Sequence, residues 1–267
     1  MEQLTALGTG YAIATKCYTT CFTISDGQEH FMIDCGGGNG VLTNLEKAGI
    51  SLGQVHHIFL SHRHTDHVMG AVWMLRMIGH GIEKGVYKGN LHMYCHQELA
   101  DGLLQMCQFM LPARLLSLFG ERIIFHCLSD GLTFDILGRK TTFFDTRSKK
   151  TLQYGVKVEL QNGKTITYLG DEPYREECAA YVAGVDYLMH EALCLESQEA
   201  IYHPHKIQHS TVKDAAECAE QLQVHSLILF HTEDKQLALR KHTYTAEAKQ
   251  YFGGWVYVPD DFDVIVL

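Results

Sequence analysis

One short segment, SHRHTDH, places three histidines and an aspartate within six positions, directly after the apolar run VHHIFL. The apolar run predicts a buried strand. In an extended loop, residues i and i+2 point the same way, so His62 and His64 are placed to bind one ion. Asp66 and His67 open the next predicted helix and face a second ion. Imidazole and carboxylate are suitable Zn²⁺ ligands, so the segment predicts a metal site at a strand end.

Three other predicted strands end in residues of the same kind. ITYLGD ends at Asp171, YLMHE at His190 and Glu191, and LILFH at His231. Functional sites are commonly built at the ends of rigid elements. We therefore expect these strand ends to converge on the histidine-rich segment.

The remaining pattern is one of strands with interspersed helices in two similar halves. The Asn162–Gly163 pair predicts a tight hairpin turn, and Thr211 with Asp214 predicts a capping box at a helix start. We expect the helix after the histidine-rich segment to end at Gly79, HSLILFHTED to be the last core strand, and a terminal helix over 244–252. The order favours two sheets faced by helices over one parallel sheet.

Composition limits the class of protein. The chain has 267 residues, 4 prolines and no Pro/Ser-rich linker, which predicts a single domain over 1–267. The segment MEQLTALGTG lacks a basic region and a long apolar run, so no secretory signal is expected. No apolar stretch reaches the roughly 18 residues of a membrane span. Nine scattered cysteines predict free thiols and a cytoplasmic protein.

The formal charge of −9 argues against a general nucleic-acid binder. It does not exclude a phosphodiester substrate at one cationic site, because a bound metal ion can dominate the local field. The 17 histidines are an unusual excess and strengthen the expectation of metal ligands.

In this context the HxHxDH motif resembles the metallo-β-lactamase superfamily and, within it, the ribonuclease Z branch. The resemblance runs nearly end to end, through LGTG, DCG, HxHxDH, GD, HEA, HST and LFH in that order. It implies a four-layer αββα sandwich with a two-metal site at one edge. It also implies a metal-dependent hydrolase of phosphodiester bonds.

Roles follow from this resemblance position by position. The implied metal ligands are His62 and His64 for the first ion, Asp66, His67 and His231 for the second, and Asp171 as a bridge. The nucleophile would be a metal-bound hydroxide, which Asp66 could orient or deprotonate. Glu191 and His209 match the pair that assists proton transfer to the leaving group. Asp34 would hold the metal loop through hydrogen bonds. Zn²⁺ is the expected metal, as one or two ions, and Mn²⁺ or Fe also suits such ligands.

The sequence departs from the family pattern at one ligand of the first metal. The family has a histidine shortly before the YG of the hairpin strand, and the aligned residue here is Arg147. Arginine is always protonated and cannot bind a cation. The site has therefore lost a ligand, or another residue supplies it. The guanidinium could instead bind a phosphate oxygen or replace the missing metal charge. The adjacent Lys149 and Lys150 could help to bind a phosphate, although we favour the interpretation that they form a solvated turn.

A second departure concerns the substrate. Members that process tRNA carry a long exosite arm, and here the hairpin runs directly from Tyr154 to Asp171. With the acidic net charge, this argues against cleavage of precursor tRNA. The expected substrate is an RNA or a small phosphodiester.

Two alternatives to a phosphodiesterase stay open. The same site could hydrolyse a thioester, lactone or amide, since one fold supports many reactions. The chain could also be a catalytically weak metal-binding or ligand-sensing protein, for which Arg147 is the evidence. The apolar segment LLQMCQFMLPARLLSLFG packs on the sandwich, lines a pocket or forms a homodimer contact.

Overall fold

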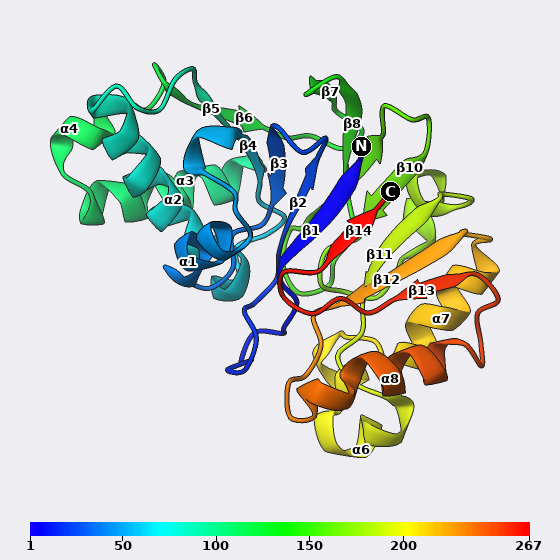
Figure 1. Ribbon diagram of the computed structural model, residues 1–267. Helices are drawn as coiled ribbons and strands as arrows, with labels where there is room; N and C mark the ends of the chain where they lie inside the picture. The colour runs from blue at the N-terminus through cyan, green and yellow to red at the C-terminus, as the bar shows by residue number, and fades with distance from the viewer.

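The chain folds into two seven-stranded sheets that pack face to face, with helices on both outer faces (Figure 1). The computed structural model describes residues 1–267. The arrangement is the four-layer αββα sandwich, so the predicted fold class is confirmed.

The first sheet has the strand order β14-β1-β2-β3-β4-β5-β6. Its strands are β1 (Gln3–Gly8), β2 (Cys21–Ser25), β3 (His30–Ile33), β4 (Val55–Phe59), β5 (Leu91–Cys95), β6 (Ile123–Cys127) and β14 (Val264–Val266). β14, β1, β2 and β3 pair antiparallel, whereas β3 to β6 pair parallel. The carboxyl ends of β3, β4 and β5 therefore lie at one edge of the sheet.

The second sheet has the order β13-β12-β11-β10-β9-β8-β7. Its strands are β7 (Thr133–Ile136), β8 (Arg139–Asp145), β9 (Tyr154–Glu159), β10 (Thr165–Tyr168), β11 (Tyr187–Glu191), β12 (Ser226–Phe230) and β13 (Trp255–Tyr257). β10 to β13 pair parallel, so the ends that precede Asp171, contain Glu191 and precede His231 lie side by side.

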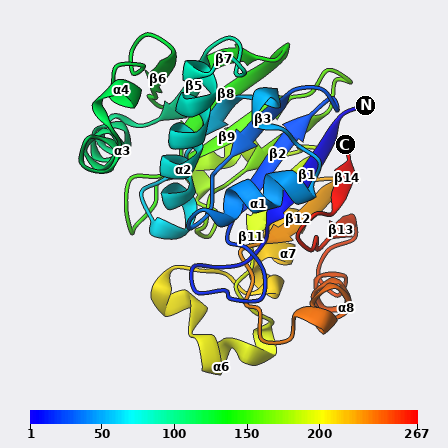
Figure 2. The ribbon, with the colours of Figure 1, turned by 60° about the vertical axis from the view of Figure 1, so that its left-hand side comes forward.

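Helices cover both outer faces of the sandwich (Figure 2). Those on the first sheet are α1 (Gly40–Lys47), α2 (Thr65–Glu83), α3 (Gln97–Met110) and α4 (Ala113–Leu116). The later ones are α5 (Ala179–Val182), α6 (Glu199–Tyr202), α7 (Val212–Gln221) and α8 (Leu237–Ala248). Short 3₁₀ turns are η1 (Leu52–Gln54), η2 (Glu176–Cys178), η3 (Glu196–Gln198) and η4 (Pro204–Ile207). None of the helices combines the length and the apolar character that crossing a membrane requires.

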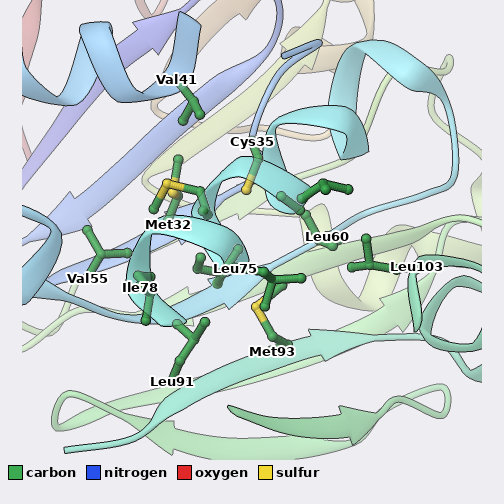
Figure 3. Close-up of a cluster of buried hydrophobic side chains, with 14 of the residues drawn as sticks. Met32, Cys35, Val41, Val55, Leu60, Leu75, Ile78, Leu91, Met93 and Leu103 are labelled. Carbon is green, nitrogen blue, oxygen red and sulfur yellow. The ribbon is translucent and has the colours of Figure 1, made fainter. Parts of the chain in front are cut away.

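Three apolar cores hold the four layers together. The first lies between the first sheet and its helices, where Met32 and Met93 meet Leu75 and Ile78 of α2 (Figure 3). The second lies between the sheets and is rich in aromatic rings, such as Phe22 and Phe230, whose centroids are 5.4 Å apart. The third joins the second sheet to α5, α7 and α8. Each sheet is thus buried on both faces, which explains the nearly continuous apolar character of its parallel strands.

Several local predictions agree with the structure. β9 and β10 form the expected hairpin, with Gly163 at φ +84° in its turn. Thr211 caps α7, and its side chain accepts from the Asp214 N–H while the Asp214 carboxylate accepts from the Thr211 N–H. Both features depend on contacts within a few residues.

The boundaries of two helices were predicted wrongly. α2 continues past Gly79 to Glu83, because this glycine allows close packing against Leu115, not a helix end. α8 spans 237–248 instead of 244–252, since its buried face includes the charged Arg240 and so lacks an apolar signature. β12 is the last strand that is buried along its whole length, as predicted, and the short β13 and β14 follow it as edge strands of the two sheets.

Candidate metal centre

The loop between β4 and α2 carries His62 and His64 toward the Asp171 carboxylate. His62 Nε2 lies 3.5 Å from Asp171 Oδ1, and His64 Nδ1 lies 3.9 Å from Asp171 Oδ2. The possible ligand atoms of the three residues all lie within 4.8 Å of one another. We call these three residues the first donor group. The loop is extended at His64, the N-cap of α2, as the i, i+2 spacing predicts.

A second donor group shares Asp171 with the first. It consists of Asp66, His67, Asp171 and His231, all buried, again with ligand atoms within 4.8 Å of one another. His67 Nε2 and His231 Nε2 each lie 3.8 Å from Asp171 Oδ2. The structure therefore brings together all six residues that the sequence suggests as metal ligands, and it places Asp171 between two groups. His190, which also ends a strand, belongs to neither group.

The chemistry of this donor set fits divalent cations. His62 Nε2, His67 Nε2 and Asp66 Oδ2 are buried and have no well-aligned hydrogen-bond partner, although the last two atoms lie 3.2 Å apart. An unpaired buried polar atom costs about 1–3 kcal/mol, so proteins rarely leave several in one place. A bound cation would satisfy these atoms together. Each group offers imidazole nitrogens with carboxylate oxygens, which is the ligand chemistry of Zn²⁺ and related metals.

Burial and charge set the protonation of these ligands. Burial lowers the pKa of His62, and it lowers the pKa of His231 to about 3. Burial alone would raise the pKa of Asp66 and Asp171, but the neighbouring histidines outweigh it and hold both below their usual values. The carboxylates are therefore ionised, and His62 and His231 are neutral, at neutral pH. Each is then in the form that binds a metal ion.

His67 is the exception among the imidazoles. Burial would lower its pKa, but the Asp66 and Asp34 carboxylates on either side raise it well above the usual value. Its Nδ1 lies 2.8 Å from Asp34 Oδ2, and its Nε2 lies 3.2 Å from Asp66 Oδ2. A metal ion at Nε2 would replace the proton that the two carboxylates otherwise favour.

Asp34 organises the metal loop from the end of β3. Its carboxylate accepts hydrogen bonds from the Ser61 N–H, the Ser61 hydroxyl and the Tyr168 hydroxyl at 2.7–2.8 Å, in addition to its contact with His67. Asp34 adopts the left-handed conformation with φ +54°, which is unfavourable for a non-glycine residue. The position therefore matches the predicted supporting role. Tyr168 has no sequence signal for this contact.

Gln153 is a second supporting residue that the sequence did not reveal. It is fully buried beside Asp171. With its amide oriented to satisfy both groups, its nitrogen donates to Asp171 Oδ1 at 3.1 Å and its oxygen accepts from the Asp171 N–H at 2.7 Å. Thr20 Oγ1 similarly lies 2.9 Å from His231 Nδ1. These contacts fix the shared carboxylate and one imidazole in orientation.

Glu191 and His209 form a pair beside the second donor group. Glu191 Oε2 lies 3.4 Å from His209 Nδ1, and Glu191 Oε1 accepts from the Ser210 N–H at 2.6 Å. The His209 ring stacks on His231 with centroids 5.2 Å apart. The Glu191 carboxylate is fully buried and therefore needs a charge or hydrogen-bond partner, and the His209 imidazole lies near enough to serve as one. The structure thus places the predicted proton-transfer pair next to the ligands.

Arg147 does not reach the centre, and its predicted place near substrate or metal is wrong. Its guanidinium lies 2.5 Å from Asp130 and 3.1 Å from Asp145. These two carboxylates raise the pKa of Arg147. The residue is exposed, and its backbone adopts the left-handed conformation with φ +58°. Lys150, for which the sequence left a phosphate contact and a solvated turn open, enters the site with Nζ 3.2 Å from His209 Nε2.

Comparison with known proteins gives this geometry a family. A sequence model of the β-lactamase superfamily domain matches residues 30–232, well over half of the chain. The chain belongs to the metallo-β-lactamase superfamily. The matched region includes all the candidate ligands, and the resemblance predicted from the HxHxDH motif is confirmed.

Among the relatives of this superfamily member, ribonuclease Z of Phocaeicola vulgatus is 23% identical over 293 residues, covering 88% of this chain and 90% of the relative. Ribonuclease Z of Pyrobaculum neutrophilum is 25% identical, covering 99% and 98%. Among solved structures, the metallo-β-lactamase fold protein YhfI from Bacillus subtilis has a TM-score of 0.79 at 18% identity, covering 99% and 98%. Human tRNase Z, short form, has a TM-score of 0.75 at 20% identity, covering 98% of each chain.

The comparisons and the donor groups agree on the general class. The relatives are ribonuclease Z proteins, and the match covers almost their whole length. The structural neighbours share the fold. The chain is a ribonuclease Z-like metal-dependent hydrolase, as predicted from its sequence.

Proposed function

We propose that the chain is a phosphodiesterase that hydrolyses a P–O bond in RNA or in a smaller diester. The observation that carries the proposal is the Glu191–His209 pair, held 3.4 Å apart beside the second donor group. The alkoxide that leaves a phosphodiester needs a proton, and this pair is placed to deliver one. The names of the ribonuclease Z relatives support the same bond type.

The donor groups would hold two ions, Zn²⁺ by preference and Mn²⁺ or Fe as alternatives. His62, His64 and Asp171 would bind the first ion, and three protein ligands leave a position free for water or substrate. Asp66, His67, His231 and Asp171 would bind the second. Bound divalent ions would supply positive charge to the phosphoryl oxygens and lower the pKa of a water molecule toward about 7.

The side chains of the protein complete the reaction. Asp66, one of the residues of the second donor group, would also accept a hydrogen bond from the attacking water and orient it. His209, in the protonated state in which its Nε2 no longer accepts from Lys150, would donate a proton to the leaving oxygen. Glu191 would keep the imidazole in place through Nδ1 and stabilise its cationic form. Asp34 and Gln153 would hold His67 and Asp171 in orientation.

The experiment compares metal-saturated and chelator-treated protein on bis(p-nitrophenyl) phosphate, a short RNA, a thioester and a lactone. We expect hydrolysis of the diester by the metal-saturated form only. Relative rates on the RNA and the small diester then choose between the two substrate sizes. Hydrolysis of the thioester or lactone without any diester would contradict the proposal, and metal binding without hydrolysis would favour a ligand-sensing protein.

Location and assembly are part of the proposal. All nine cysteines are free, which suits the reducing cytosol. α3 leaves Phe109 92% exposed and Met110 43% exposed, and these side chains would lie in the contact of the proposed homodimer. Sedimentation velocity of wild type and Phe109→Ser tests the dimer, which the substitution should weaken.

A further inference from the structure

Lys150 brings an ammonium group into the candidate metal centre. Its Nζ lies 3.2 Å from His209 Nε2 and 3.9 Å from Asp171 Oδ2. The side chain is only 21% exposed, so the charge lies within the site. An ammonium cannot bind a metal ion and repels one at close range. The ligand set therefore gives no reason for a lysine between the shared carboxylate and the proton-donating histidine.

The fold holds the backbone of Lys150 in place. The buried Glu172 carboxylate accepts hydrogen bonds from the Lys149 N–H at 3.1 Å, from the Lys150 N–H at 3.2 Å and from the Ser148 hydroxyl. Glu172 directly follows Asp171, so the shared metal ligand and the anchor of the lysine loop are consecutive residues. Arg147 holds the other side of the loop through Asp130 and Asp145. Hydrogen bonds to its backbone thus hold the loop in place, and the loop directs one cationic group, the Lys150 ammonium, toward the metal centre.

The charge arrangement suits a bound anion. Of the two neighbours of Nζ, only His209 Nε2 is within hydrogen-bond distance, so donors of the ammonium remain available. Divalent ions at the donor groups would repel Lys150, whereas an anion between them would be attracted from both sides. A phosphodiester carries such a charge on its non-bridging oxygens, and lysine is a common phosphate ligand.

We propose that Lys150 binds a non-bridging phosphoryl oxygen of the substrate and thereby selects an anionic phosphate ester over a neutral thioester or lactone. The inference rests on the proposed function and names a substrate-binding residue for it. Lys150 lies three residues after Arg147 on the same loop.

The test compares Lys150→Met with Lys149→Met in the metal-saturated protein. Lys149 is the matched control, because it is the exposed neighbour on the same loop. We expect Lys150→Met to raise KM for bis(p-nitrophenyl) phosphate roughly 10- to 100-fold, the value of a hydrogen bond to a charged group. Calorimetric titration with inorganic phosphate should show a similar loss of affinity. Lys150→Arg should recover part of both, and Lys149→Met should stay within about twofold of wild type.

Three results would separate the inference from its alternatives. Unchanged phosphate affinity in Lys150→Met, at unchanged metal content, would overturn the assignment. Loss of metal ions from Lys150→Met would also overturn it, because the lysine would then organise the ligands and not the substrate. If wild type hydrolyses no diester, the proposed function fails, while the phosphate titration still decides the role of Lys150.

Discussion

Asp171 is the residue on which the whole centre depends, because it is the member common to both donor groups. We expect Asp171→Ala to lose both ions and to reduce diester hydrolysis by more than about 100-fold. This loss exceeds the usual effect of replacing a residue that only hydrogen-bonds to a metal ligand. Elemental analysis after gel filtration measures the ions. Glu217→Ala, an exposed carboxylate on α7, is the control. Retention of either ion in Asp171→Ala would refute the bridging role.

The effect of His209 on the rate of hydrolysis should be larger for a leaving group that needs a proton than for one that does not. We expect His209→Ala to slow hydrolysis of a diester with an alkyl leaving group by about 10²–10⁴-fold. The loss should be much smaller for p-nitrophenolate, which leaves without protonation. Metal content should be unchanged, since His209 belongs to neither donor group. Equal losses on the two substrates would argue that His209 is not the proton donor.

At the residue scale, the sequence predicts those site residues that follow apolar strands. His62, Asp171 and His231 each follow the end of an apolar strand, a place where polar side chains commonly form a functional site. Gln153 could not be predicted, and a phosphate contact of Lys150 was one of two interpretations that stayed open. Both positions depend on Asp171 and Glu172, which contact them only in the folded chain. Arg147 was misplaced for the same reason, since Asp130 and Asp145 direct it outward.

At the element scale, β4, β5 and β6 carry a histidine cluster distinct from the metal centre. His57 stacks on His92 with centroids 5.1 Å apart, and His92 Nδ1 lies 2.9 Å from His126 Nε2. Tyr94 completes the cluster, with its hydroxyl 3.0 Å from His57 Nδ1. Burial, and then the charges of His92, His56 and His126, lower the pKa of His57 to about 4. Burial also lowers the pKa of His92 and His126.

We expect this cluster to lower the free energy of unfolding in mild acid. Between pH 6.5 and about 4 the unfolded chain binds a proton at His57 that the folded chain does not, so the free energy of unfolding decreases as pH falls. The His57 contribution is no more than about 2–3 kcal/mol, because the ring keeps some contact with water. We expect His57→Phe, which preserves the stacking, to flatten the pH dependence measured by urea unfolding.

The exposed His242 provides the control for that measurement. His242→Gln should leave the slope between pH 6.5 and 4 unchanged. The metal ligands are the same in all three proteins, so their own pH dependence cancels in the comparison. A slope in His57→Phe equal to that of wild type would show that His57 does not titrate as described.

Elements with local signals were predictable, and elements that depend on distant partners were not. The β9–β10 hairpin follows from Asn162–Gly163, and the start of α7 follows from its capping box. α8 could not be placed, because the partners of Arg240 are Thr232, Pro259 and Asp260 from other segments. The short β13 and β14 are strands only because they pair with β12 and β1 of the two sheets.

At the scale of the whole molecule, a buried ion pair joins the two sheets. Arg139 of β8 and Glu2, next to β1, are 1% and 6% exposed, and Arg139 Nε lies 3.0 Å from Glu2 Oε2. Glu2→Ala would leave the guanidinium buried without its counter-charge. We expect the free energy of unfolding to fall by about 3–5 kcal/mol, measured by urea denaturation. Glu29→Ala, at an exposed turn, should have little effect.

The double variant Glu2→Leu with Arg139→Leu checks the cause. Replacing a buried pair by apolar side chains is often neutral, so much of the lost stability should return. A double variant as unstable as Glu2→Ala would indicate that packing, and not the unpaired charge, explains the loss.

The two-sheet architecture brings distant segments to one edge of the sandwich, where two donor groups share Asp171. The most direct test is the number of metal ions per chain, by elemental analysis after saturation with Zn²⁺ or Mn²⁺ and gel filtration. The structure predicts two ions, since each group has at least three ligands. One ion or none would contradict the shared centre and the mechanism built on it.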